Sequence, residues 1–346
     1  MAVKQEFFEK TKDGQDVYLY TLENKNGMKA EIINFGAVLL RLFVPNKKGE
    51  IADVVEGYDC LENYYSNPGN FGATIGPSAN RIGDAKFEID GETYHIQMND
   101  GPNNLHSHFD LGFQKRVWTA TVGDNSVTLR TSCKDGEMGF PGNIKASITY
   151  SLNNDNELEL SYHAVSDKKT IINLTNHSYF NLKGSGSGTI EDNIMWIRAS
   201  HYTDVREGAI CTGEIKSVKG TPLDFTSPKR VGDEIDADFG PINIAGGYDH
   251  NFVIDNYDGT VQLVARVEDK EAERTMEVYT DLPGIQFYAG NGTSTHPGKD
   301  GSTLKKRSSL CLETQYFPNS ANIPSFPSCI FGPDREYYSN TIYKFI

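Results

Sequence analysis

The chain has 346 residues, of which 38% are hydrophobic and 11% aromatic, so it is long enough to bury a substantial core. Its formal net charge of −14 repels the phosphates of nucleic acids and anionic membrane surfaces. The five cysteines are scattered and form no Cys-x-x-Cys pair, which is typical of reduced thiols. No apolar run approaches the ~20 residues of a membrane span, and charges occupy the N-terminal region where a secretory signal is apolar. We therefore expect a cytoplasmic protein that binds neither nucleic acid nor membranes.

Strand patterns recur along the chain, separated by turn residues. The apolar stretch 30–44 contains Gly36, which predicts a bend or bulge, and Asp90-Gly91 lies between two short strand-like runs, which predicts a hairpin. The alternating runs 147–152 and 157–165 flank four Asn and Asp residues and predict a second hairpin. Further strands are expected at 127–131, 261–267, 275–280 and 285–289, and short helices only at 61–65 and 229–235.

Many short strands separated by turns indicate an all-β protein, either a β-sandwich or a barrel. The chain shows no linker rich in Pro or Ser, no shift in composition and no sustained repeat. We therefore predict one large antiparallel β domain that covers residues 1–346.

The stretch 173–182 reads Asn-Leu-Thr-Asn-His-Ser-Tyr-Phe-Asn-Leu and predicts a short strand. Because side chains on a strand alternate between its faces, His177 shares one face with amide, hydroxyl and phenol groups. The four neighbours on that face are Asn173, Thr175, Tyr179 and Asn181. Such a face suits a polar, uncharged ligand such as a sugar, because polar groups buried without partners are penalised. The alternative is a solvated edge strand whose histidine caps a turn.

A second candidate strand, at 309–319, carries an acidic side chain. Leu310 and Leu312 would point to one side, while Cys311, Glu313 and Gln315 point to the other. A carboxylate on the mixed face of a mostly apolar strand is either a structural hydrogen-bond acceptor or a positioned base.

Three further segments contain polar side chains of kinds that most often have a structural role. Asp249 follows two glycines and suits an Asx-type turn, and Arg81, after Asn80, suits a surface charge. His106 and His108 have a spacing at which one strand can offer two metal ligands. A metal centre needs three or four ligands, and no His-Glu-x-x-His run exists, so we expect no metal.

Two of these segments closely resemble the aldose 1-epimerase, or galactose mutarotase, family. The stretch 173–182 resembles the segment with that family's catalytic acid, and Leu-Glu-Thr-Gln-Tyr-Phe-Pro-Asn at 312–319 resembles the segment with its general base. The matching segments follow the family's order from residue 72 to residue 319, close to the whole chain. The resemblance implies a β-sandwich of the galactose mutarotase type, with His177 as the acid and Glu313 as the base.

The resemblance also implies substrate-binding roles for four other residues. Asn-Asn-Leu-His at 103–106 matches a family segment whose histidine, here His106, sits beside the sugar's ring oxygen. Arg81 would face a ring substituent, with Asn80 beside it, and Asp249 would hold sugar hydroxyls.

The chain departs from the family pattern at two points. It has Gly76-Pro77 where the family has Gly-Arg, and Ser107-His108 where the family has Gly-Gly. The two added side chains are expected to narrow or reshape the rim of the site. The preferred aldose, and whether it is a disaccharide, is therefore left open.

The activity implied by the resemblance is isomerisation. The enzyme would interconvert the α and β anomers of a free galactose- or glucose-type aldohexose by acid–base ring opening, without a cofactor, as a monomer or homodimer. A nearby carboxylate would hold His177 protonated while Glu313 stays ionised. The alternatives are a glycoside hydrolase using Asp249 and Glu313, a sugar-phosphate epimerase using Arg81, and a non-catalytic carbohydrate-binding module.

Overall fold

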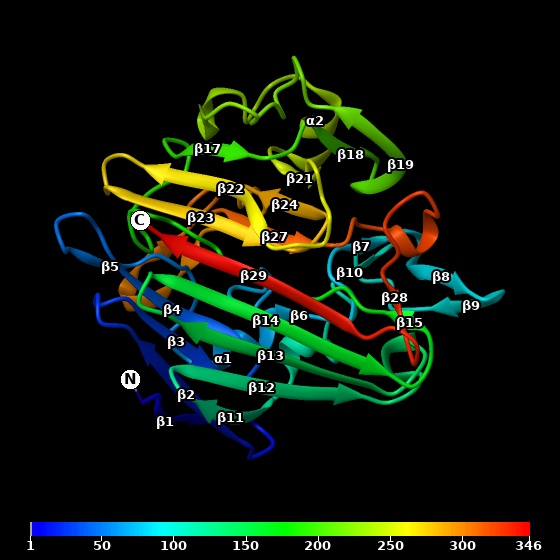
Figure 1. The fold of residues 1–346 in the computed structure, drawn as a ribbon, viewed down its shortest axis with the longest axis horizontal. Coiled ribbons are helices and arrows are strands. Elements are labelled where there is room, and N and C mark those ends of the chain that lie inside the picture. The colour runs from blue at the N-terminus through cyan, green and yellow to red at the C-terminus, as the bar shows by residue number, and fades with distance from the viewer. Residues whose placement is uncertain (1) are drawn as a thin grey trace.

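The computed structural model describes residues 2–346 and is built from antiparallel sheets (Figure 1). The largest sheet has nine strands. In spatial order they are β11 (Thr119–Gly123), β12 (Ser126–Cys133), β13 (Ile144–Leu152), β14 (Glu157–Ser166), β29 (Tyr337–Phe345), β23 (Arg274–Thr280), β22 (Gln262–Asp269), β17 (Ile194–Ile197) and β20 (Lys229–Arg230). The expected all-β, antiparallel sandwich class is confirmed.

Two five-stranded sheets pack with the large one. The first, from the N-terminal part of the chain, orders β1 (Lys4–Lys10), β2 (Asp16–Glu23), β3 (Lys29–Ile33), β4 (Val38–Pro45) and β5 (Ile51–Asp53). The second orders β19 (Ile210–Ser217), β18 (His201–Arg206), β21 (Asp249–Val253), β24 (Gly284–Tyr288) and β27 (Cys311–Gln315). Hydrophobic side chains from all three sheets meet in one core.

Short strand pairs and helices complete the fold. The pairs are β6 (Thr74–Ile75) with β16 (Thr175–Asn176), β7 (Arg81–Ile82) with β10 (Asn104–Leu105), β8 (Lys86–Ile89) with β9 (Glu92–His95), β15 (Thr170–Ile171) with β28 (Ile330–Phe331), and β25 (His296–Pro297) with β26 (Thr303–Leu304). The two α-helices are α1 (Leu61–Ser66) and α2 (Gly240–Ala245). Within residues 2–346, no helix is long and apolar enough to cross a membrane.

Most of the predicted local elements are present. The hairpins β8–β9 and β13–β14 form as expected, and a bend with positive φ at Gly36 and Ala37 separates β3 from β4. The helix expected at 61–65 is α1. The helix expected at 229–235 is wrong: this segment pairs as β20 and then makes only a 3₁₀ turn, Val231–Asp233. Helix α2 lacks the periodic length that would have revealed it.

The stretch 173–182 is not the continuous strand that its composition predicts. Only Thr175–Asn176 pairs as a strand. Asn173 makes one isolated bridge, to Ser78, and Phe180 makes two, to Val55 and Leu310. All ten residues are buried, so the solvated edge strand is also wrong. The segment threads between layers, and its backbone groups find partners on several neighbours instead of one, which satisfies them without a regular ladder.

Candidate active site

A pocket of about 340 Å³ brings together all six site residues expected from the sequence. They are Asn80, Arg81, His106, His177, Asp249 and Glu313. The chain supplies them from positions far apart: β7 and the residue before it, β21, β27, and the segments that follow β10 and β16. The fold therefore brings six separate sequence signals together in one concave site that has both polar and apolar walls.

A larger hollow of about 1110 Å³ lies elsewhere, against the outer face of β12, β13 and β14. Its cationic side chains include Arg130 and Lys145, but His163 there pairs with Glu336, and both of these side chains are largely exposed. The smaller pocket is the better candidate, because it combines a buried imidazole with a buried carboxyl group.

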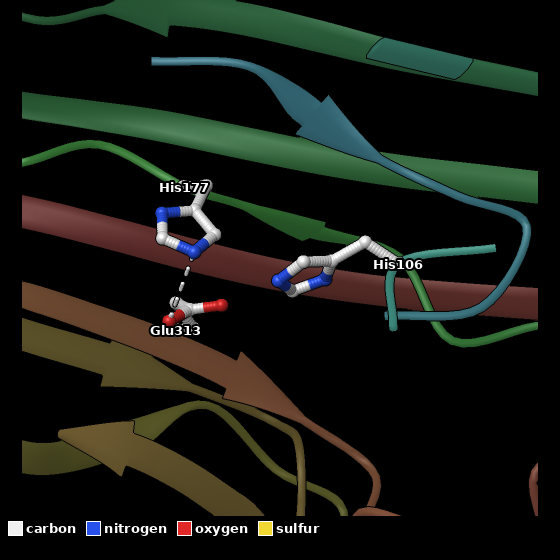
Figure 2. A group of neighbouring side chains, drawn as sticks. All are labelled: His106, His177 and Glu313. Carbon is white, nitrogen blue, oxygen red and sulfur yellow. Dashed lines mark ion pairs between the residues drawn. The ribbon is translucent and has the colours of Figure 1, made fainter. Parts of the chain in front are cut away.

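The closest acid–base contact in the pocket joins His177 and Glu313. Nε2 of His177 lies 3.6 Å from Oε1 of Glu313, and the two side chains are 7% and 3% exposed (Figure 2). The backbone holds His177 on both sides: its N–H donates to the Ala73 carbonyl, and its own carbonyl accepts from the N–H of Gly72. Tyr179 stacks on the imidazole at a centroid distance of 5.1 Å.

Burial opposes charge on both members of this pair. It lowers the pKa of His177 to about 4, against the opposing effects of a hydrogen bond to its own backbone and the negative charge of Asp249. Burial also raises the pKa of Glu313 well above its usual value, and Asp249 adds to this. The substrate-free pair therefore favours a neutral carboxylic acid beside a neutral imidazole, which differs from the expected imidazolium and carboxylate.

His106 presents one ring nitrogen to the pair. Its Nδ1 accepts a hydrogen bond of 3.2 Å from the backbone N–H of Asn80, so the neutral ring carries its proton on Nε2. In Figure 2 the other nitrogen faces Glu313 and His177. Its ring meets that of His177 edge-on at 5.2 Å. Both Asn80 and His106 have positive φ, 60° and 56°, a strained backbone that is common at functional sites.

Arg81 and Asp249 form the charged side of the pocket. Nε of Arg81 donates to Asp100 at 2.8 Å, and its Nη1 lies 3.8 Å from Oδ2 of Asp249. Gln286 donates to Oδ1 of Asp249 at 2.7 Å. These partners orient a guanidinium and a carboxylate side by side, an arrangement that suits the adjacent hydroxyl groups of a sugar.

Asn80 supports the site more than it faces the cavity. Its Nδ2 donates to Gln315 at 3.3 Å, and its Oδ1 accepts from the N–H of Arg81. Gln315 in turn donates to Gln286 at 3.0 Å, which completes a chain of amides from Asn80 to Asp249. From the sequence, Gln315 was expected only to share a strand face with Glu313, and no role was expected for Gln286.

The pocket also has an aromatic wall, of which the sequence indicated only Tyr179. Phe71, Tyr179, Tyr288 and His296 line one side of the pocket, and Phe71 lies 4.1 Å from Tyr179 between ring centroids. Tyr288 lies in a predicted strand. Phe71 lies in an irregular segment and His296 in the two-residue strand β25, and neither segment has a periodicity that shows what the side chain faces. Aromatic faces of this kind cover the apolar C–H face of a pyranose.

Ser107 and His108, where the family has two glycines, are not among the residues that line this pocket. Ser107 is fully buried: its hydroxyl donates to the carbonyl of Ser78 and accepts from the N–H of Ser78. His108 lines an adjoining hollow of about 140 Å³ that shares Leu105 and His106 with the pocket, and its Nδ1 accepts from the N–H groups of Asp110 and Leu111. A narrowed or reshaped rim at these positions stays a prediction.

The pairing of His106 with His108 as metal ligands is not seen. Within the described residues, the group of His, Cys, Asp or Glu close enough to hold an ion is His106, His177 and Glu313, with ligand atoms within 4.8 Å. A metal at His106 would need the lone pair of Nε2, which carries the proton while Nδ1 accepts from Asn80. The absence of a metal cofactor stays a prediction.

Known proteins resemble this chain over almost its full length. Residues 18–344 match the family described as aldose 1-epimerase. A galactose mutarotase from Pongo abelii is 39% identical over 345 residues, covering 99% of this chain and 98% of that protein. An aldose 1-epimerase from Escherichia coli is 36% identical over 337 residues, covering 96% of both.

Solved structures agree with the sequence matches. Galactose 1-epimerase from Lactobacillus acidophilus superposes with a TM-score of 0.86 at 28% identity, covering 100% of this chain and 99% of that one. An aldose epimerase homologue from C. elegans also reaches 0.86 at 28% identity, covering 95% and 98%. The chain belongs to the aldose 1-epimerase family, the isomerases that interconvert the α and β anomers of aldoses.

Proposed function

We propose that Glu313 and His177 are the base and the acid of this anomer interconversion, acting on a galactose- or glucose-type aldohexose. The observation that carries the assignment is their contact: 3.6 Å between His177 Nε2 and Glu313 Oε1, inside one buried pocket. The substrate class is supported by the names of the relatives, among them galactose mutarotases.

Anomer interconversion requires ring opening, rotation and ring closure. Opening removes a proton from the C1 hydroxyl and delivers one to the ring oxygen, so a base and an acid must flank the same O–C–O unit. Each such group contributes about 10²–10⁴-fold to the rate. The reaction breaks and re-forms the bond between C1 and the ring oxygen, with two proton transfers and no net oxidation or reduction, which agrees with the prediction that no cofactor takes part.

The pair passes a single proton through the cycle. In the free enzyme it rests on Glu313, because burial disfavours both charged forms. Transfer from Oε1 to Nε2 of His177 gives a carboxylate and an imidazolium without changing the net charge. The carboxylate then takes the C1 hydroxyl proton and the imidazolium protonates the ring oxygen, which restores the neutral pair beside the open aldehyde. Closure on the other face of the carbonyl reverses these steps.

The remaining residues hold the sugar in place. His106, with its proton on Nε2, would donate to the ring-oxygen side. Arg81 and Asp249 would bind ring hydroxyls, while Asn80 would act mainly by fixing His106 and Arg81 through its backbone and amide groups. The rings of Tyr179 and Phe71 would cover the sugar's apolar face.

Polarimetry on freshly dissolved α-galactose and α-glucose tests the assignment. We expect Glu313→Gln to slow the enzymatic decay of rotation by about 10²–10⁴-fold. The wild type should give a bell-shaped pH profile, falling at low pH when the pair gains a second proton and at high pH when it loses its only one. Glu336→Gln is a matched control, because Glu336 contacts His163 outside the pocket. Equal decay rates for wild type and Glu313→Gln would remove the proposed base.

The alternatives from the sequence are less well supported. A glycoside hydrolase using Asp249 and Glu313 leaves the contact between Glu313 and His177 without a role. A sugar-phosphate epimerase needs free cations, whereas Arg81, which lines the pocket, already contacts Asp100 and Asp249. A non-catalytic module disagrees with membership of an enzyme family.

Location and assembly also remain proposals. A cytoplasmic enzyme is supported by the acidic composition and by the five cysteines, all free thiols. A single domain over residues 1–346 is supported by a core cluster whose members run from Tyr20 to Phe345. Monomer and homodimer are both compatible with a site built from one chain.

A further inference from the structure

The thiol of Cys311 lies against the imidazole nitrogen that the mechanism leaves free. Sγ of Cys311 is 3.6 Å from Nδ1 of His177, while Nε2 of the same ring is 3.6 Å from Glu313. Figure 2 shows this other nitrogen of His177 pointing away from both Glu313 and His106. The imidazole is thus held between a thiol and a carboxyl group.

One strand supplies both contacts. Cys311 and Glu313 are two residues apart on β27, so their side chains point to the same face. Their backbones pair with Tyr288 and Gln286 of β24 in an unbroken register. This register fixes the two backbone positions, so both side chains approach His177 from the same face of one strand.

The thiol is a suitable partner for an N–H group. Cys311 is completely buried, and burial raises the pKa of its thiol well above the usual value; the charge of Asp249, and that of Glu313 whenever it is ionised, act in the same direction. The thiol therefore stays uncharged. Sulfur is only a weak acceptor, so it can orient an N–H without the strong attraction that a carboxylate would exert on an imidazolium.

We propose that Cys311 is a positioning residue, which keeps the proton of neutral His177 on Nδ1 and leaves the lone pair of Nε2 directed at Glu313. This proposal rests on the acid–base pair proposed above. It explains how the neutral ring can accept the proton of Glu313: the opposite tautomer, with a proton on Nε2, would place N–H against the acid proton and block the transfer.

Six titratable groups surround the ring and define the test. They are Cys311 and Glu313 on β27, Asp249 on β21, Tyr288 on β24, His106 after β10, and Tyr179 on the histidine's own segment. Among these groups the thiol alone contacts Nδ1, in addition to the hydrogen bond that the ring makes to its own backbone, so a substitution at Cys311 changes one side-chain partner and leaves the other five groups in place.

The experiment compares Cys311→Ser and Cys311→Ala with Cys329→Ser, a control at a thiol that is also buried but lies outside the pocket. A serine oxygen is a stronger acceptor than sulfur, so it should stabilise the imidazolium and raise the pKa of His177 above about 4. The acid limb of the pH profile should then move to higher pH. Cys311→Ala should lower kcat about fivefold, the effect of one lost hydrogen bond, with little change in KM.

Nitrogen-15 NMR of the histidine-labelled wild type reads the tautomer of His177 directly. The variant His177→Asn is used only to assign the signal, which is absent from its spectrum. We expect the neutral His177 signal to be that of the Nδ1–H tautomer. An Nε2–H tautomer, or identical pH profiles for wild type, Cys311→Ser and Cys311→Ala, would overturn the proposal. Neither result would touch the assignment of Glu313, which fails only if Glu313→Gln keeps full activity.

Discussion

At the scale of single residues, Glu313 combines a cost in stability with the surroundings that its proposed chemical role needs. Its Oε2 is buried without a hydrogen-bond partner, and burial with the charge of Asp249 raises its pKa. An acid in such surroundings keeps its proton to higher pH than an ordinary glutamate does, which suits a reversible proton donor and acceptor. Replacing a residue of this kind with a neutral isostere often stabilises the protein.

We therefore predict that Glu313→Gln raises the thermal unfolding temperature, and more so as pH rises. A carboxyl group whose pKa is raised by folding adds stability that is full below its unfolded pKa and is lost as pH rises through its folded pKa. The glutamine variant lacks this loss. Melting curves from about pH 5 to about pH 8 should show a widening gap over wild type.

The matched control for this prediction is Glu336→Gln. Hydrogen bonds from Tyr338 and His163 lower the pKa of Glu336, which is the opposite shift, so its replacement should bring no gain in unfolding temperature at high pH. A constant difference between Glu313→Gln and wild type at all pH values would mean that Glu313 keeps an ordinary pKa in the folded protein.

At the scale of elements, a buried lysine anchors the hairpin that forms one rim of the pocket. Lys299 lies between β25 and β26, just after His296 of the aromatic wall, and its side chain is 1% exposed. Its Nζ donates to Asp53 at 2.6 Å and to the Leu40 carbonyl at 2.7 Å. This hairpin therefore depends on two contacts with the N-terminal sheet.

We predict that Lys299→Met destabilises the protein and weakens sugar binding. Removing one partner of a buried pair costs about 3–5 kcal/mol, and the lower end applies because Arg41 is also 3.6 Å from Asp53. Because the hairpin forms a wall of the site, KM should rise more than kcat falls. Denaturant unfolding and steady-state kinetics measure both effects.

Lys305→Met provides the control, because Lys305 is exposed and follows β26 on the same segment. It should leave both stability and KM close to wild type. If Lys299→Met lost stability but kept the wild-type KM, the hairpin would not shape the sugar site.

At the scale of the whole molecule, the last strand closes the fold. Strand β29 lies in the middle of the nine-stranded sheet, shown in red between β14 and β23 in Figure 1, and it pairs with both neighbours. Its alternate residues, including Tyr337 and Tyr343, are buried in the core. The N-terminal strand β1, by contrast, lies at a sheet edge and is mostly exposed.

We predict that the two ends tolerate truncation very differently. A chain without residues 337–346 should fail to fold, because the sheet would lose a central strand and expose two unpaired edges. A chain without residues 2–10 should fold and keep its activity with a lower unfolding temperature. Soluble yield and near-UV circular dichroism distinguish the outcomes. A folded, active protein without β29 would contradict the central role of that strand.

The sequence by itself determined the elements whose signals are local. Alternation predicted β13 and β14, the Asp90-Gly91 pair predicted a hairpin, and the resemblance named six residues that the structure places in one pocket. Alternation succeeds because a strand with one buried face repeats every two residues, whatever its partner. The roles of these six residues remain predictions.

Only the tertiary structure decided what depends on contacts between distant segments. In the folded protein the stretch 173–182 makes separate bridges to several segments in place of one strand. Asn80 donates to Gln315, the first link in a chain of amides, and Cys311 contacts His177. The tertiary structure also made both members of the acid–base pair favour their neutral forms, whereas the sequence suggested an ion pair. The physical reason is that the desolvation of an ionisable group depends on all the atoms packed around it. The residues adjacent in sequence determine neither how deeply the group is buried nor which distant side chain it contacts.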